Sequence, residues 1–416
     1  MTPAARLQAA IDILEELEKS ALPADRFLRG WFRARRYAGS KDRAVIAERV
    51  FDVFRHRSEY RWRMQGETSR AVVIASLLRE GADPAELFTG GYGPAPLTEA
   101  EREAIAHRPT DGPSAHIRGE YPHFLEAELI RRFGEELPDA MRALTERAAI
   151  DLRVNTLKAK RADVLPILRG EGFEAEQTPF APNGMRIAPG GGSAALQKSR
   201  LFQSGAFEFQ DEAAQIAALL CDARPGQHVL DLAAGAGGKS LALAAAMENE
   251  GKLVACDVRK GALDNLRDRA TRAGASIIAP RLVNELRNET FDVVLLDAPC
   301  SGTGTWRRQP ELRWRLTPER LGELNATQDV LLDQAAKHTR PRGRLIYATC
   351  SILPRENEDR IAAFLARHAG FGIVRAETVW RESGALDTPP GMTEFFNASP
   401  HRTGTDGFFT AILRRG

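Results

Sequence analysis

Apolar residues at helical spacing dominate the first 80 residues of the chain. Leu7, Ile11, Leu14 and Leu17 follow one another at intervals of four, three and three residues, as the residues on one face of a helix do. The segments 27–32 and 46–54 repeat the pattern, and an arginine lies between the apolar residues of the first segment. We therefore expect a small helical bundle in this part of the chain.

Short apolar runs alternate with helical patterns from residue 201 to the end. Four of these runs, at 229–232, 253–256, 293–296 and 345–348, are almost continuously apolar. Such runs are typical of strands in a parallel sheet that helices cover on both faces. Ligands of such sheets bind at the carboxyl ends of the strands, and the residues with reactive side chains follow the strands here.

A smaller α/β pattern lies between these two regions. Residues 151–157 alternate like a strand, and residues 162–169 have a helical pattern that ends at Gly170. A break rich in glycine and proline at 90–96 separates this pattern from the first helices. We predict a helical domain over 1–105, a small α/β linking domain over 115–200 and an α/β core over 201–416.

The composition is that of an ordinary globular protein, with 43% hydrophobic and 27% charged residues. The net charge is only +2, but residues 26–70 contain 13 Lys/Arg against 5 Asp/Glu. Such a segment suits a polyanion, because neutralised phosphates release counterions. The acidic partners of these residues can equally lie elsewhere in the fold, and both interpretations stay open here.

The four cysteines are widely spaced and contain no C-x-x-C, which argues against a zinc site and a disulfide framework. The histidines show no metal-ligand spacing, and no apolar run approaches the ~18 residues of a membrane helix. The first residues also lack the basic and apolar order of a targeting segment. We expect a reduced, cytoplasmic, monomeric protein without a metal or a membrane segment.

A glycine-rich segment, DLAAGAGGKS at 231–240, follows the first strand of the core and opens a helix. A dinucleotide fingerprint fails because position 240 is serine. A P-loop shares Gly238, Lys239 and Ser240, but Ala233 stands at its leading glycine position, so a P-loop NTPase remains an alternative for this segment alone. Asp257, at the end of the next strand, suits the ribose hydroxyls of an adenosyl ligand and has no role in a P-loop.

Two cysteines follow two of the strands, in Asp297-Ala-Pro-Cys300 and in Thr349-Cys350. Two thiols at one sheet edge would suit methyl transfer to carbon 5 of cytosine. This carbon is a poor nucleophile until a thiolate adds at carbon 6. Asp297, if it carries a proton, is placed to stabilise the resulting ring at nitrogen 3, and a second thiol would assist release. The spacing does not say which cysteine attacks, while Cys221 and Cys256 are assigned to the apolar core.

Together these motifs resemble the RsmB/Sun (NOP/Sun-type) RNA cytosine-5 methyltransferase family. The resemblance covers most of the chain, and D-A-P-C, T-C-S and D-G-F-F in this order form a highly specific combination. The segments that carry it are FQDE at 209–212, the loop at 231–240, DAPCSGTGT at 297–305, RRQPELRW at 307–314, YATCSILPRENE at 347–358 and DGFF at 406–409.

The resemblance implies a Rossmann-like class I methyltransferase core, an all-α NusB-like RNA-binding domain and a small α/β linking domain that begins near RVNT at 153–156. It implies S-adenosylmethionine as the donor and a cytosine of RNA as the acceptor, with small-subunit (16S) rRNA the family-level expectation. It also implies that Cys350 attacks and that Cys300 assists release. The implied donor-binding residues are Ala233, Ala234, Gly235, Ala236, Gly237, Gly238, Lys239, Asp257, Asn284 and Asp297.

The chain departs from the family pattern at two positions. Gly235-Ala236 replaces Ala-Pro in the donor loop, and the nearest counterpart of the family's donor-contacting aspartate is Asn284, unless the chain has none. With the basic helical region, the altered loop keeps a second hypothesis open, a non-catalytic RNA-binding or ribosome-assembly factor. Four arginines near Trp306 and Trp314 are expected to bind RNA by phosphate pairing and base stacking, unless the segment is an ordinary surface helix whose tryptophans lie in the core. They are Arg307, Arg308, Arg313 and Arg315.

Overall fold

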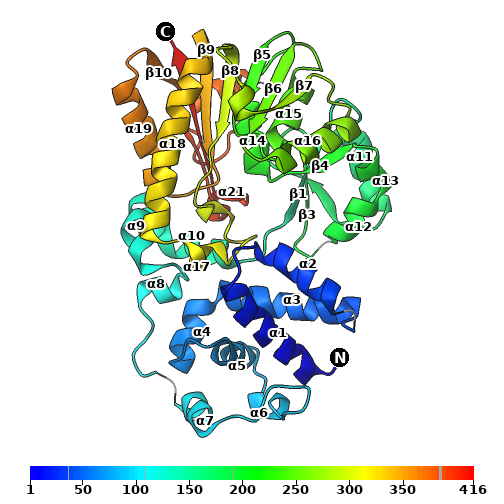
Figure 1. Cartoon of the computed structure of the whole chain (residues 1–416), viewed down its shortest axis with the longest axis vertical. Coiled ribbons are helices and arrows are strands. Elements are labelled where there is room, and N and C mark those ends of the chain that lie inside the picture. The colour runs from blue at the N-terminus through cyan, green and yellow to red at the C-terminus, as the bar shows by residue number, and fades with distance from the viewer. Residues whose placement is uncertain (36, 108, 191, 384–386) are drawn as a thin grey trace. The chain divides into compact units, whose positions relative to one another are not determined.

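The computed structural model describes residues 1–35, 37–107, 109–190, 192–383 and 387–416, which form two compact units (Figure 1). The helical unit comprises Met1–Glu146 and Trp306–Leu316, and the sheet unit comprises Arg147–Thr305 and Thr317–Gly416. The chain thus leaves the sheet unit after Thr305 and returns to it at Thr317. The boundary between these units does not coincide with the expected domain limits, so the division into three domains stays a prediction.

The helical unit confirms the predicted bundle at the start of the chain. Helices α1 (Pro3–Glu18), α3 (Ser40–Arg55) and α5 (Ser69–Arg79) pack against one another through their apolar faces. Thr2 begins α1, because its hydroxyl accepts the Ala5 N–H. The other helices of the unit are α2 (Ala24–Ala34), α4 (Arg57–Met64), α6 (Pro84–Leu87), α7 (Glu99–Ala106), α8 (Ala115–Arg118), α9 (Glu126–Phe133), α10 (Leu137–Thr145) and α17 (Leu312–Arg315).

Much of the basic excess of residues 26–70 is neutralised inside the helical unit. Several of its arginines form ion pairs with glutamates from outside that stretch. These pairs are Arg35–Glu16, Arg49–Glu80, Arg57–Glu18 and Arg70–Glu101. Arg26, Arg33 and Lys41 remain exposed, so both interpretations of the basic stretch hold, each for a different subset of residues.

A small antiparallel sheet in the order β2-β3-β1-β4 begins the sheet unit. The alternating segment 151–157 supplies β1 (Ile150–Val154), and α11 (Arg161–Gly170) follows it as expected. The strand β3 was not predicted, because its four residues lie inside a stretch rich in glycine and proline. The remaining elements are β2 (Ala175–Gln177), β3 (Gly184–Ile187), β4 (Phe207–Phe209), α12 (Ser193–Lys198) and α13 (Arg200–Gln203).

The larger sheet has the order β10-β12-β9-β8-β5-β6-β7, and β11 pairs with β12. The four predicted apolar strands are present as β5, β6, β8 and β9, and they run parallel. The predicted parallel sheet is therefore confirmed for these four strands, while β12, which was not predicted, pairs antiparallel with β9. The strands are β5 (His228–Asp231), β6 (Lys252–Asp257), β7 (Ile278–Leu282), β8 (Phe291–Asp297), β9 (Thr339–Thr349), β10 (Phe371–Val374), β11 (Phe396–Ala398) and β12 (Phe408–Arg415).

Helices cover both faces of this sheet (Figure 1). Successive strand residues face opposite sides, so that Val293 packs with one group of helices and Val294 with the other. One face carries α14 (Glu212–Leu219), α15 (Gly238–Ala246) and α16 (Lys260–Ala273), and the other carries α18 (Pro318–His338) and α19 (Glu358–Arg367). Among the described residues, no helix is long and apolar enough to cross a bilayer.

Candidate active site

The glycine-rich loop joins the end of β5 to the start of α15. Gly237 has a φ of +82°, which favours glycine, and a Cβ there would lie 1.9 Å from the Leu266 Cδ1 atom, so a larger residue would also displace that side chain. Gly235 has a φ of +56°, and its N–H donates to the Asp257 Oδ2 atom at 2.9 Å. The altered donor loop is therefore an ordered turn whose backbone is tied to the end of the neighbouring strand.

Asp257 ends β6 and is 5% exposed. Its carboxylate accepts the Gly235 N–H and both the backbone and side-chain N–H groups of Arg259. Burial raises the pKa of Asp257, but the hydrogen bonds from Arg259 outweigh burial and place that pKa below its ordinary value. Asp257 is therefore a carboxylate at neutral pH, as a ribose-binding acceptor requires.

Asp231 was not among the expected site residues, although it opens the glycine-rich segment. It ends β5, and its Oδ2 atom accepts the Ser240 hydroxyl at 2.6 Å. Its Oδ1 atom is buried and has no hydrogen-bond partner within the described part of the chain. Burial raises the pKa of Asp231 to about 7, and the charges of Asp297 and Asp257 act in the same direction. Leaving a buried oxygen without a hydrogen bond is energetically costly, so a hydrogen-bond donor group of a ligand would fit beside it.

Lys239 lies in the first turn of α15 and pairs with Asp297 at the end of β8. The distance between Lys239 Nζ and Asp297 Oδ2 is 2.6 Å. Burial lowers the pKa of Lys239, but the charge and the hydrogen bond of Asp297 outweigh it, and the net shift is upward. The Lys239 ammonium also lies 5.0 Å from the ring centroid of Phe408, in the D-G-F-F segment. Asp297 is therefore paired with the Lys239 ammonium at the end of β8.

The structure brings the two predicted cysteines together. Cys300 follows β8 and Cys350 follows β9, and their Sγ atoms are 3.4 Å apart. Both side chains are partly exposed. The hydrogen bond with Cys350 and burial raise the pKa of Cys300 well above its ordinary value. Cys221 and Cys256 are buried, as expected.

Backbone hydrogen bonds join the loops that carry the motifs. The Gly304 N–H donates to the Cys350 carbonyl at 2.9 Å, and the Gly407 N–H donates to the Gly304 carbonyl at 2.8 Å. A Cβ on Gly304 would lie 2.0 Å from the Gly407 carbonyl oxygen. The D-A-P-C-S-G-T-G, T-C-S and D-G-F-F segments therefore touch through glycines that a larger residue would separate.

Asn284 lies in a short 3-10 helix, Val283–Glu285, directly after β7. Its side chain is exposed. The strand β7 pairs with β6, and Leu282 lies opposite Asp257 in the register. Asn284 is therefore close in the fold to the donor-loop edge, and its contact with a donor stays a prediction.

The arginine-rich segment has a different environment from the one expected. Trp306–Leu316 belongs to the helical unit, and Arg313 is 0% exposed. The Arg313 guanidinium lies 4.7 Å from the ring centroid of Trp306 and donates to the Leu144 carbonyl. The expectation that Arg313 grips RNA is wrong in this conformation, because the side chain is enclosed by protein.

Neighbouring residues of this segment also bind the helical unit. The Trp314 indole N–H donates to the Phe54 carbonyl at 2.7 Å, and Arg315 donates to the Leu22 carbonyl at 2.8 Å. Glu311 accepts the Ala24 N–H, while Arg307 is 7% exposed. RNA contacts of Arg307, Arg308 and Arg315 stay a prediction.

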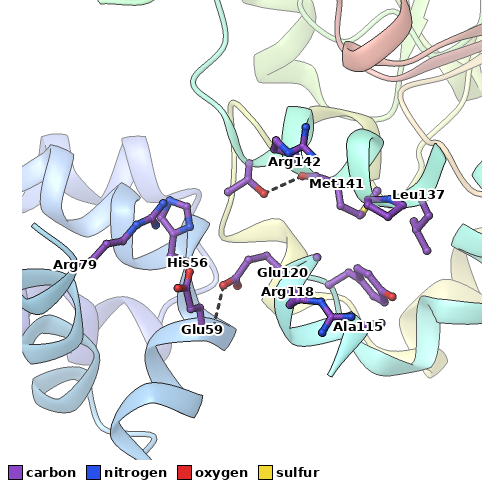
Figure 2. A pocket seen from close by; sticks show the side chains of 13 residues that line it. His56, Glu59, Arg79, Ala115, Arg118, Glu120, Leu137, Met141 and Arg142 are labelled. Atoms are coloured by element: carbon purple, nitrogen blue, oxygen red, sulfur yellow. Dashed lines mark hydrogen bonds between the residues drawn. The ribbon is translucent and has the colours of Figure 1, made fainter. Parts of the chain in front are cut away.

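A cavity of about 400 Å³ lies within the helical unit (Figure 2). His56, Glu59, Arg79 and Glu120 are among its lining residues, and the Glu120 carboxylate accepts the Ser58 and Glu59 N–H groups at the start of α4. Burial lowers the pKa of His56 to about 3 and raises that of Glu120 to about 8. The ligand atoms of His56, Glu59 and Glu120 lie within 4.8 Å of one another. The Arg79 cation in the same lining disfavours a metal ion there.

Comparisons with known proteins relate both units to one family. Residues 218–414 match the model of the 16S rRNA methyltransferase RsmB/F family, and residues 121–191 match the ferredoxin-like domain model of RsmF/B-like methyltransferases. The ribosomal RNA small subunit methyltransferase B of Cronobacter sakazakii is 30% identical over 410 residues, which are 90% of each chain. A probable methyltransferase B of Bacillus subtilis is 32% identical, over 64% of this chain and 59% of that protein.

Solved structures are similar as well. The protein in the crystal structure of PH0851 is 28% identical to this chain in sequence. The two structures have a TM-score of 0.78, and the match covers 100% of this chain and 99% of that one. A methyltransferase homologue from Pyrococcus horikoshii is 26% identical, with a TM-score of 0.61 over 72% of this chain and 97% of that one. The Rossmann-like core is therefore confirmed.

Proposed function

The chain belongs to the 16S rRNA methyltransferase RsmB/F family, and on this premise we propose that it transfers a methyl group from S-adenosylmethionine to carbon 5 of a cytosine in small-subunit (16S) rRNA. The observation that carries the proposal is the 3.4 Å separation of Cys300 and Cys350. Methyl transfer to an oxygen or a ring nitrogen needs no thiol, whereas transfer to carbon 5 needs a nucleophile that adds and leaves.

The residues at the ends of β5 and β6 fit the donor. Gly235 and Gly237 let the backbone approach a ligand closely, and Asp231 offers a buried oxygen without a partner. A ribose at Asp257 would replace the Arg259 side chain, which is 70% exposed. Ala233, Ala234, Ala236, Gly238 and Asn284 complete the proposed lining. When bound, the donor supplies an electrophilic methyl group on its sulfonium.

The chain's own side chains account for the remaining steps. The Cys350 thiolate adds to carbon 6 and forms a carbon–sulfur bond, while nitrogen 3 takes a proton from the Lys239 ammonium through Asp297. Carbon 5 of the resulting enamine accepts the methyl group and then loses its original proton to solvent. The carbon–sulfur bond breaks, nitrogen 3 returns its proton to the Lys239–Asp297 pair, and the Cys350 thiolate is restored.

The family resemblance assigns Cys350 as the nucleophile, because either sulfur could donate the hydrogen bond between the two thiols. The pKa of Cys300 is raised well above its ordinary value, first by the hydrogen bond with Cys350 and then by burial. In this geometry a protonated Cys300 would donate a hydrogen bond to a Cys350 thiolate. The same donor stabilises Cys350 again as it leaves carbon 6, which is the releasing role expected for Cys300.

A direct assay tests this function. Small-subunit rRNA from cells that lack this protein is incubated with the protein and S-adenosylmethionine, digested, and analysed by nucleoside mass spectrometry. We expect the content of 5-methylcytidine to rise, and calorimetry should show binding of S-adenosylmethionine. Failure to bind the donor would instead favour the non-catalytic RNA-binding hypothesis, and a methyl group on another atom would contradict the proposed chemistry.

A further inference from the structure

A buried carboxylate connects the two cysteine loops. Glu356 is 0% exposed and lies at the end of a short 3-10 helix, Pro354–Glu356, after β9. Its carboxylate accepts the Ser301 N–H at 2.8 Å and the Ser301 hydroxyl at 2.5 Å. It also accepts the Ser351 hydroxyl at 2.5 Å and the Gln328 amide at 3.0 Å. Ser301 directly follows Cys300, and Ser351 directly follows Cys350.

These contacts are energetically demanding. A carboxylate without solvent is stable only when its lone pairs are occupied by donors, and Glu356 receives four of them. Two donors come from the loop of Cys300 and one from the loop of Cys350. Neither loop can shift without leaving part of this buried charge unpaired, which gives both loops a common restraint.

The surrounding hydrogen bonds hold Glu356 itself in place. The Tyr347 hydroxyl donates to the Glu356 carbonyl at 2.6 Å. The Asn357 side chain accepts from the Thr349 hydroxyl and donates to the Ser351 carbonyl. Residues on both sides of Cys350 are therefore bound to the segment that carries Glu356.

We propose that Glu356 is a positioning residue that holds the loops of Cys300 and Cys350 so that the two sulfur atoms face each other. Glu356 has no direct contact with either sulfur in the described structure, so it acts through Ser301 and Ser351. Its effect on catalysis rests on the function proposed above, whereas its effect on the separation of the sulfurs does not.

Cross-linking measures that separation without methyl transfer. Diamide removes two electrons and two protons from a pair of thiols, and the Cys300 and Cys350 sulfurs need only approach from 3.4 Å to the disulfide length of about 2.05 Å. In Glu356→Gln, one oxygen becomes an amide that faces donors. We expect its disulfide to form about 10-fold more slowly than in the unaltered protein, with kcat lowered about 10- to 100-fold and the KM for RNA unchanged.

Glu212→Gln is the matched control. Glu212 is also 0% exposed and accepts two backbone N–H groups, from Phe180 and Ala181, but within the described part of the chain it has no contact with either cysteine loop. We expect its cross-linking rate to stay within about twofold of that of the unaltered protein. Equal slowing in both variants would mean a general loss of structure and would overturn the positioning role.

Serine variants keep the test decisive if Glu356→Gln does not fold. Ser301→Ala and Ser351→Ala each remove the hydroxyl contact with Glu356, together with a hydroxyl contact to Thr303, and should each slow the cross-link. Where Glu356→Gln folds, adding Ser351→Ala to it should slow the cross-link no further. Both substitutions disrupt the same hydrogen bond, from the Ser351 hydroxyl to the Glu356 carboxylate. Unchanged cross-linking in the glutamate or serine variants overturns the inference. If the unaltered protein forms no 5-methylcytidine but the variants still cross-link more slowly, the proposed function is refuted and the positioning role of Glu356 stands.

Discussion

Two adjacent segments, residues 297–305 and residues 306–316, differ in what their sequences allowed one to predict. The first contains Asp297 and Cys300 and lies at the strand ends of the sheet unit, where its side chains meet those of other motifs. The second is rich in arginine and tryptophan, yet it belongs to the helical unit, and Arg313 is fully buried. A residue that directly follows a parallel strand is placed at the carboxyl edge of the sheet. The presence of a charged side chain, in contrast, does not show whether that side chain faces solvent.

The largest expected effect tests the first segment and its partner loop. Cys350→Ala should lower methylation of natural RNA on the order of 10⁴-fold or more, because the nucleophile is removed. Cys300→Ala should instead retain attack and accumulate protein bound to natural RNA, which a denaturing gel would detect. Accumulation of that adduct in Cys350→Ala would reverse the two roles.

The ion pair at the same edge gives the next effect. Lys239→Met removes the cation that faces Asp297 and should lower kcat about 10²- to 10³-fold, because the proton for ring nitrogen 3 loses its source. Steady-state methylation assays measure this change. Lys260→Met, which removes an exposed ion pair with Asp264, is the control and should leave kcat unchanged. Equal rates for both variants would exclude Lys239 from the reaction.

Features that depend on a local sequence pattern can be predicted for this molecule, whereas features that depend on contacts between residues far apart in the chain cannot. The strands β5, β6, β8 and β9 follow from apolar runs, and their parallel order brings Cys300 and Cys350 to one edge. The antiparallel strand β12 did not follow, because its apolar run has the same local pattern as a parallel strand. The burial of Arg313 against Trp306 and Leu144 depends on contacts across 169 residues of chain, which no local pattern contains.

Arg313 tests the second segment directly. Arg313→Ala leaves a cavity and an unpaired Leu144 carbonyl, and it should lower the free energy of unfolding of the helical unit by about 2–4 kcal/mol. Urea unfolding followed by tryptophan fluorescence measures it. The exposed Arg33, changed to alanine, should cost less than about 0.5 kcal/mol. If Arg313→Ala left stability intact but weakened RNA binding, the original expectation for this arginine would be restored.

The smallest effect concerns the cavity of the helical unit. The pKa of Glu120 is raised to about 8 from 4.5, so the folded protein keeps a proton that the unfolded chain releases, and stability falls as the pH rises through this window. The pKa of His56 is lowered to about 3 from 6.5, so its contribution to stability increases as the pH rises toward 6.5. Between about pH 6.5 and 8, opening of α4 should therefore become easier as the pH rises.

Hydrogen exchange of the α4 amides, corrected for intrinsic exchange rates, measures this slope. Glu120→Gln should make the opening free energy independent of pH in that window, because the titrating group is absent. An identical slope in the variant would assign the pH dependence to another group.

The central claim is that Cys350 forms a covalent bond with the cytosine ring, and trapping tests it most directly. RNA that contains 5-fluorocytosine blocks the elimination at carbon 5 that precedes release of Cys350, since fluorine does not leave as a proton does. Peptide mass spectrometry then locates the bound nucleotide. The account predicts a methylated fluorocytosine on the peptide that contains Cys350. A nucleotide on the Cys300 peptide, or the absence of any adduct from a protein that binds both RNA and donor, would contradict it.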